Sequence, residues 1–122
     1  MHELSLAGEI IRATSEKLRD MEDVLCRRLR VRVGELSGVS AESLRFCLEA
    51  ARAGTPLERL DVEVEVVRPK LVCPTCGEVE CEGRFDIVCP QCSGRISGVV
   101  GGRELDVQLE CEAQGQGRTH ED

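Results

Sequence analysis

Four of the cysteines in this chain have the spacing of a metal site. Cys73 and Cys76 form one C-x-x-C pair, Cys89 and Cys92 form a second, and twelve residues separate the pairs. Each pair can turn two sulfurs onto one ion, and a short hairpin can bring the pairs together, so the sequence predicts a tetrahedral Zn²⁺ site. Four sulfur ligands leave no position for a substrate water, so this zinc would be structural. The alternatives are two disulfides or free thiols.

The two pairs differ in the residues that follow them. Gly77 comes directly after Cys76, where a knuckle turn needs a positive φ. Gly94 comes one place later than the equivalent position after Cys92, so we expect the second knuckle to be less regular.

Other cysteines have simpler interpretations. Cys47 falls on the apolar face of a predicted helix and is expected to fill the core. Cys26 lies near a predicted strand and is expected to be inert. Cys81 lies between the two pairs, where it could exchange as a fifth ligand, but we favour an unbound thiol.

The start of the chain, Met1-His2-Glu3, could also bind a metal. The α-amine of Met1, the amide of His2 and the imidazole of His2 can form adjoining chelate rings, and Glu3 can add its amide or its carboxylate. Such nitrogen-rich, planar donor sets favour Ni(II) or Cu(II). Met1 should be retained, because methionine removal normally needs a small second residue. Taken alone, a histidine at position two is more often incidental.

Hydrophobic periodicity predicts two helices. The first should begin at Glu3 or Leu4 and fray within residues 21–27. The second should begin after Ser40 as N-cap and end near Gly54. Their apolar faces share the three- and four-residue spacing of helices and comprise Leu4, Ala7, Ile11, Thr14, Leu18, Met21 and Leu25 in the first, and Leu44, Cys47, Leu48 and Ala51 in the second.

Alternating apolar and charged residues predict three strands, around Leu29–Val33, Leu60–Val66 and Leu105–Cys111. Their order stays open. Arg30 and Arg32 between two acidic strands would relieve like-charge pairing, whereas an insertion with close ends would make the second and third strands neighbours. The predicted fold class is α+β, with two helices packed on a three-stranded sheet and an inserted zinc ribbon.

These elements divide the chain into residues 1–69 plus 99–112, which form the α+β domain, and residues 70–98, which form the zinc ribbon. The polar tail, residues 113–122, is expected to be disordered. The ribbon is too small to bury much apolar surface, so its folding should depend on metal.

Composition excludes several classes of function. A net charge of −7 and two aromatic residues oppose binding to nucleic acid. The first residues resemble no signal peptide, and no apolar run approaches the ~20 residues of a membrane span, so we expect a cytoplasmic protein. His2 and His120 are the only histidines, so no Ser/His/acid catalytic set can be assembled, and we expect no enzyme.

Several motifs occur in a recognisable order. They are Met1-His2-Glu3-Leu4-Ser5-Leu6-Ala7, Val33-Gly34-Glu35-Leu36-Ser37-Gly38-Val39, Ser43-Leu44-Arg45-Phe46, the two C-x-x-C pairs, and Gly102-Arg103-Glu104-Leu105. Together, over residues 1–111, they resemble the HypA/HybF family of hydrogenase-maturation nickel metallochaperones.

The resemblance implies a nickel-binding α+β domain and a zinc domain. Ni(II) would be held at the amino terminus through Met1, His2 and Glu3, and Zn(II) by Cys73, Cys76, Cys89 and Cys92. Family members deliver nickel to the large-subunit precursor of [NiFe]-hydrogenase together with a partner GTPase, and some also serve urease. A homodimer is left open. Some relatives have histidines beside the zinc knuckles. This chain lacks them, so the resemblance does not extend to a pH-responsive role toward urease.

Two other hypotheses remain. A zinc-ribbon adaptor for nucleic acid or protein is opposed, for nucleic acid, by the acidic residues between the knuckles and the negative charge of a tetrathiolate centre. A rubredoxin-like iron protein has the same sulfur spacing but would be red and redox-active.

Overall fold

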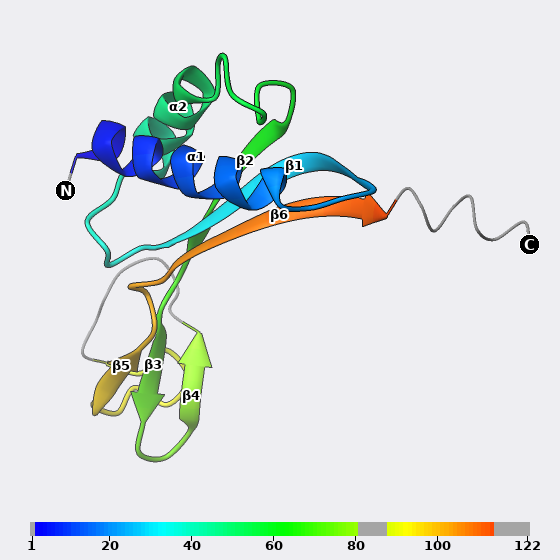
Figure 1. Ribbon diagram of the computed structural model, residues 1–122. Coiled ribbons are helices and arrows are strands. Elements are labelled where there is room, and N and C mark those ends of the chain that lie inside the picture. Colours follow the sequence, from blue (N-terminus) through cyan, green and yellow to red (C-terminus); the bar gives the residue numbers. More distant parts are fainter. Residues whose placement is uncertain (1, 81–87, 114–122) are drawn as a thin grey trace, which may run out of the picture.

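The computed structural model describes residues 2–80 and 88–113 of the chain. Two helices cover one face of a three-stranded sheet in the order β2-β1-β6 (Figure 1). This unit, which we call the body, consists of α1 (Glu3–Arg19), α2 (Ala41–Ala51), β1 (Val24–Gly34), β2 (Asp61–Val67) and β6 (Leu105–Ala113). Among the described residues, the helices lack the length and hydrophobicity needed to span a bilayer.

A second sheet is inserted between β2 and β6. We call this unit the ribbon; its strands are β3 (Lys70–Cys73), β4 (Gly77–Glu80) and β5 (Gly98–Val100), in the order β4-β3-β5. It forms a separate lobe beside the body (Figure 1). The predicted α+β class with an inserted ribbon is confirmed. The ribbon sheet runs to Val100, past the residue 98 at which the sequence placed its end. Cys81 and the tail beyond Ala113 lie outside the described residues.

The strand order of the body is explained by charge. β1 lies at the centre, parallel to β2 and antiparallel to β6. Its outward-facing arginines therefore lie between two acidic rows, and Arg30 contacts Glu63 at 3.5 Å and Glu110 at 3.0 Å. The alternative that made the second and third strands neighbours is wrong. β1 and β2 are instead joined through α2 as a parallel βαβ unit.

The core lies between this sheet and the helices. It is made of buried side chains from all layers: Leu6, Ala7, Ile10, Ile11, Leu29, Val31, Val33, Leu44, Leu48, Leu57 and Leu60. Cys47 packs against it as expected.

The predicted apolar face of α1 is partly wrong. Leu4 and Leu25 were expected inside but are 67% and 44% exposed. The predicted Ala7, Ile11 and Thr14 are buried, and the buried face also includes Leu6 and Ile10. The helix ends at Arg19 without a frayed continuation. Leu25 already belongs to β1, because the chain turns at Asp23, which has a positive φ, into an extended strand.

The second helix begins as predicted. Ser40 is extended, and its hydroxyl accepts a hydrogen bond from the amide of Ser43 at 3.2 Å. Glu42 lies in the first turn, where a negative charge favours the helix.

The expectation for Cys26 is also wrong. Cys26 and Cys111 lie directly opposite each other in the β1–β6 ladder and form a disulfide. Strand order could not be predicted from the sequence, so the two cysteines, 85 residues apart, could not be paired in advance.

A glycine contact fixes the junction between body and ribbon. A Cβ on Gly34 would overlap the carbonyl oxygen of Gly102, so only glycine fits. The two amides that follow Gly34 bind both segments of chain that connect the body to the ribbon. Glu35 N–H donates to the carbonyl of Val67 at 2.9 Å, and Leu36 N–H donates to that of Gly102 at 2.6 Å. This contact gives the Gly34–Gly38 and Gly102–Leu105 motifs a shared structural role.

Candidate metal centre

The four predicted zinc ligands converge at one end of the ribbon. The sulfurs of Cys73, Cys76, Cys89 and Cys92 all lie within 4.8 Å of one another. Two of the distances are 3.6 Å, between Cys73 and Cys92, and 4.0 Å, between Cys76 and Cys89. A tetrahedral ion with Zn–S bonds of 2.3 Å separates its sulfurs by about 3.8 Å. The four sulfurs therefore fit a metal ion with tetrahedral thiolate coordination. They form the one cluster of this kind among residues 2–80 and 88–113.

The two knuckles have matching backbones. Gly77 has φ 81°, as predicted, and the residue after Cys92 adopts the same left-handed conformation. That residue is Ser93, with φ 67°, rather than Gly94. The second knuckle is thus regular in shape, but a serine occupies a conformation that favours glycine.

Backbone amides point at the sulfurs, as they do around bound thiolates. Gln91 N–H donates to the sulfur of Cys89 at 3.4 Å, and Gly94 N–H donates to that of Cys92 at 3.4 Å. Amides of Cys76 and Thr75 act in the same way on Cys73. These dipoles stabilise negative charge on the sulfurs before any cation arrives.

The thiols do not share this effect equally. The amides of Cys76 and Thr75 lower the pKa of Cys73 to about 7. The pKa of Cys76 is raised to about 12, first by its hydrogen bond with Cys92 and then by desolvation. Cys73 thus ionises easily, whereas the hydrogen bond with Cys92 and desolvation keep Cys76 protonated. A bound divalent cation reverses this by displacing the remaining protons.

Apolar packing around the cluster is limited. Cys73 and Cys89 are buried with Leu71 and Val79, and Ile96 packs against them. Cys76 and Cys92 are exposed. The cysteines therefore form much of the small core that they would support.

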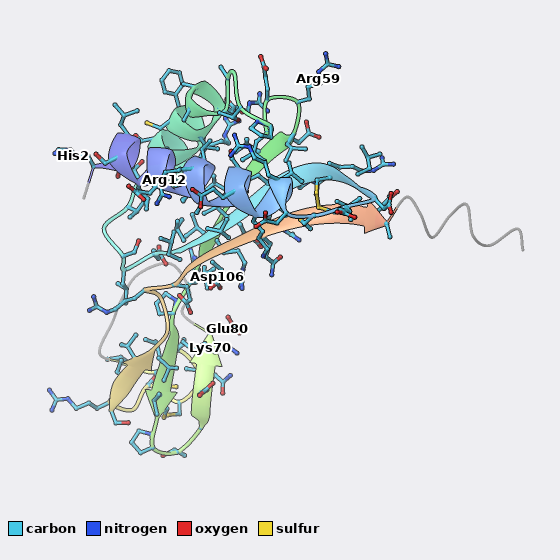
Figure 2. The ribbon with its side chains drawn as sticks, in the orientation of Figure 1. His2, Arg12, Arg59, Lys70, Glu80 and Asp106 are labelled. Atoms are coloured by element: carbon cyan, nitrogen blue, oxygen red, sulfur yellow. A yellow bond between two sulfur atoms is a disulfide. The ribbon has the colours of Figure 1, made fainter. Side chains whose placement is uncertain are left out.

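The predicted nickel ligands lie at the start of α1, at the far end of the body from the disulfide (Figure 2). His2 is the N-cap; its backbone is extended, its side chain makes no capping hydrogen bond, and it is exposed. Its carbonyl accepts the hydrogen bond of Leu6 N–H at 3.0 Å. Met1 lies outside the described residues. The imidazole of His2 is therefore free of the helix and open to solvent.

The carboxylate of Glu3 has a partner that the sequence did not reveal. It accepts a hydrogen bond from the backbone amide of Ser40 at 2.9 Å. This contact joins the start of α1 to the start of α2. The Ser40 amide is the main cause, followed by Glu3's own amide, of the lowered pKa of Glu3; the charges of the terminal amine and His2 add to it. Ser40 was recognisable as an N-cap, but nothing in the sequence paired it with Glu3.

Comparison with known families identifies one match. A family described as hydrogenase/urease nickel incorporation, metallochaperone, hypA matches residues 1–111. Among curated proteins, the hydrogenase maturation factor HypA of Streptomyces avermitilis is 38% identical, covering 98% of this chain and 92% of its own. The protein of the same name from Acidithiobacillus ferrooxidans is 35% identical, covering 92% and 100%.

Solved structures support the fold. The solution structure of the Ni metallochaperone HypA from Helicobacter pylori aligns with a TM-score of 0.57 at 21% identity, covering 93% of this chain and 99% of that one. At this level of identity, the likeness supports the arrangement of helices and sheets and not the ligands.

Proposed function

This chain belongs to the HypA family of nickel-incorporation metallochaperones, and on that premise we propose that it binds Ni(II) at its amino terminus and delivers it to the large-subunit precursor of a [NiFe]-hydrogenase. The family acts by carrying nickel during hydrogenase maturation and is not a family of enzymes. The observation that carries the proposal is the position of His2, exposed at the first residue before a helix.

The start of a helix offers amides that nickel can use. The first four N–H groups of a helix have no intrahelical acceptor. The amides of His2 and Glu3 can therefore lose their protons to Ni(II) without breaking the helix. The first helical hydrogen bond, from Leu6 N–H, uses the carbonyl of His2, which the metal leaves free. With the α-amine of Met1 and the imidazole of His2, these amides complete a nitrogen-rich set.

Charge at this site is balanced in a way that suits a carrier. The positive end of the α1 dipole opposes a divalent cation, and deprotonated amides and the Glu3 carboxylate offset it. One oxygen of Glu3 is engaged by Ser40 N–H, so the carboxylate is held beside the site. Exposure of His2 lets a receiving protein reach the metal. Binding of moderate strength at an open site favours transfer.

We assign Zn(II) to Cys73, Cys76, Cys89 and Cys92 as a structural ion. The donor set favours zinc or iron, and iron remains the alternative. When bound, the ion would supply cross-links between the two knuckles and no chemistry on nickel.

The partners are inferred from the family. We propose a nickel-linked GTPase and the hydrogenase large-subunit precursor as partners, action in the cytoplasm, and no binding to nucleic acid; a homodimer stays open. Hydrogenase is preferred to urease as the client because the chain has no histidine between His2 and His120.

A titration of the untagged, zinc-loaded protein with Ni(II) tests the site. Wild type should bind one equivalent, and His2→Ala should abolish stoichiometric binding while zinc content and helix signal stay unchanged. Glu3→Gln should weaken binding by roughly tenfold, because it removes one negative charge near the cation and weakens the hydrogen bond to Ser40.

Glu9→Gln is the matched control, since it removes the same charge from an exposed position of α1. It should leave nickel affinity unchanged. Equal effects of the two glutamine variants would make Glu3 a contributor to net charge only. Full nickel binding by His2→Ala would remove the proposed site. In cells, His2→Ala should lower the amount of nickel-loaded hydrogenase large subunit.

A further inference from the structure

The disulfide between Cys26 and Cys111 belongs to neither metal site. It joins the beginning of β1 to the end of β6. The ribbon is attached at the opposite end of these two strands, beyond Gly34. Figure 2 shows the yellow sulfur bond near the ends of β1 and β6, far from the labelled His2. Its chemistry can therefore change without a change in either set of metal ligands.

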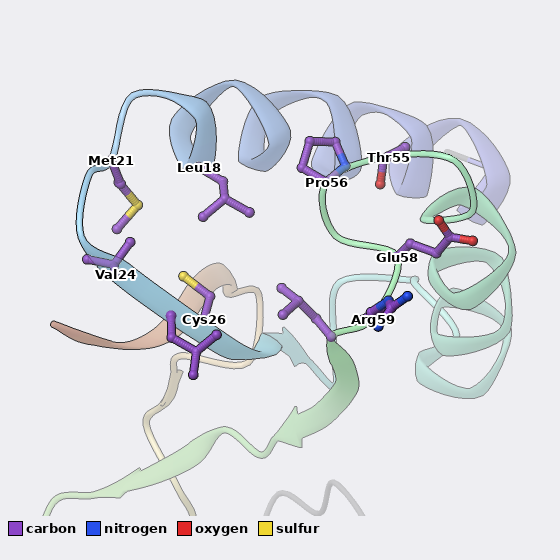
Figure 3. Close-up of a pocket in the computed structure, with 10 residues that line it drawn as sticks. Leu18, Met21, Val24, Cys26, Thr55, Pro56, Glu58 and Arg59 are labelled. Carbon is purple, nitrogen blue, oxygen red and sulfur yellow. The ribbon is translucent and has the colours of Figure 1, made fainter. Parts of the chain in front are cut away.

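The bridge can be approached from solvent. Cys26 lines an open groove of ≈ 510 Å³ between the end of α1, the start of β1 and the segment before β2 (Figure 3). Leu18 and Met21 form one wall, and Pro56 and Arg59 lie on the opposite side. Cys111 lines a second hollow with Arg27 and Glu112. Both cysteines are only partly buried, and disulfides that a thiol can reach exchange more readily than enclosed ones.

The ladder is weak beside the bridge. The register shifts between Cys26 and Arg28, so Arg27 is an extra residue that bulges from β1. Beyond it, Val24 and Leu25 pair with Ala113 and Glu112 at the end of both strands. Leu25 is exposed and adds little packing. The covalent bond therefore holds together a strand end that the bulge separates from the rest of the ladder.

We propose that Cys26 and Cys111 form a thiol–disulfide exchange site that reacts with a dithiol reductant and controls the order of this end of the sheet. A thiolate of the dithiol attacks the Cys26 sulfur through the groove, forms a mixed disulfide, and releases Cys111 as a thiolate, which takes up a proton. The second thiol of the reductant then displaces Cys26. Two electrons and two protons pass to the protein, and the reductant becomes a disulfide.

Peptide mapping tests the exchange directly. Trypsin places Cys26 alone in residues 20–27, Cys111 alone in residues 104–118 and Cys47 alone in residues 46–52. Zinc-loaded, full-length protein is equilibrated with oxidised or with reduced dithiothreitol, and free thiols are alkylated. The protein is then digested with trypsin, and the peptides are identified by mass spectrometry. We expect residues 20–27 and 104–118 to be joined under the oxidised reagent and both to be alkylated under the reduced one, with Cys47 alkylated in both.

Hydrogen exchange tests the structural effect. On reduction, amides of residues 24–26 and 111–113 should exchange roughly tenfold or more faster, while those of β3 and β4 and the zinc content stay unchanged. The Cys26→Ser/Cys111→Ser variant should exchange like reduced protein under both reagents, and the control Cys47→Ser should respond to reagent like wild type.

Three results would overturn the proposal. They are the absence of the joined peptides under oxidised dithiothreitol, persistence of the bond in excess reduced reagent, and reduction without faster exchange at the strand ends. Because nickel is absent from these measurements, failure of the nickel proposal would leave their outcome unchanged.

Discussion

The body and the ribbon each contain a three-stranded sheet, but different interactions stabilise the two sheets. In the body, two helices cover the sheet and bury a cluster of apolar side chains in which Leu29, Val31 and Leu44 are fully enclosed. In the ribbon, no helix covers the described strands, and two of the four buried core residues are the cysteines Cys73 and Cys89.

The difference indicates where folding energy comes from in each unit. Burial of apolar surface stabilises the body. The ribbon has too little apolar surface for this, so we expect binding of an ion by its thiolates to supply most of its stability. The body can then present the amino terminus whether or not the ribbon is folded.

Removal of the ribbon's metal should have the largest effect. Structural zinc contributes about 10–16 kcal/mol in small zinc domains, so Cys89→Ser should unfold the ribbon while most of the helix signal of the body remains. Zinc content, circular dichroism and hydrogen exchange of β3 amides would measure this. The matched control is Cys47→Ser, on α2, which should keep its zinc. A ribbon that stays protected from exchange without metal would abolish the contrast between the units.

A cavity in the body should have the opposite effect, destabilising the body and leaving the ribbon's metal site unchanged. Leu29→Ala removes a side chain that is 0% exposed at the centre of β1, and should lower the free energy of unfolding of the body by about 2–5 kcal/mol. Zinc affinity should not change. Leu25→Ala, on the same strand but exposed, should alter stability by less than ~0.5 kcal/mol. Loss of zinc in Leu29→Ala would mean that the two units fold together.

The ion pairs between the arginines of β1 and the acidic residues of β2 and β6 should contribute less to stability. Arg30→Glu replaces an arginine that contacts Glu63, Glu65 and Glu110, and should cost about 1–2 kcal/mol because the new carboxylate then faces three like charges. Added salt should shrink this cost by screening the repulsion. Denaturant unfolding at two salt concentrations would measure it, and a cost that does not depend on salt would point to packing instead.

The smallest expected effects come from the knuckle turns. Ser93→Gly should stabilise the zinc-loaded ribbon by about 0.5–1 kcal/mol, and Gly77→Ser should destabilise it by a similar amount, because both positions need a positive φ. A Cβ at Gly77 would meet no atom within 4 Å, so backbone conformation alone is tested. Chelator competition would rank the variants; the same sign for both changes would show that the knuckles are not equivalent.

Local features of the fold could be predicted from the sequence because they depend on neighbouring residues. The start of α1 at Glu3, the N-cap Ser40 and the alternation along β1 all rest on short-range patterns. The convergence of the C-x-x-C pairs was also foreseeable, since a tetrahedral ion needs all four sulfurs. The buried face of α1 was not, because Leu4 and Leu6 are equally apolar and only the packed sheet decides between them.

Features that depend on strand order could not be predicted. The Cys26–Cys111 disulfide follows from β1 and β6 being neighbours, which the alternation of residues alone does not determine. The Glu3–Ser40 contact likewise needs the position of α1 against α2. Ser93 was not predicted because glycine is the usual residue at a positive φ and Gly94 is the nearest glycine. The turn instead requires a positive φ at the residue directly after Cys92.

The central claim is that nickel is anchored by the free amine at the start of α1. The most direct test is calorimetric titration of the untagged protein and of a form with a short Gly-Ser extension before Met1. The extension keeps His2 and Glu3 but converts the amine to an amide and moves the terminus away. We expect one equivalent of nickel to bind the untagged protein and stoichiometric binding to be lost in the extended one, with zinc and helix content equal in both. Equally tight binding by the extended protein would contradict the claim and place nickel elsewhere.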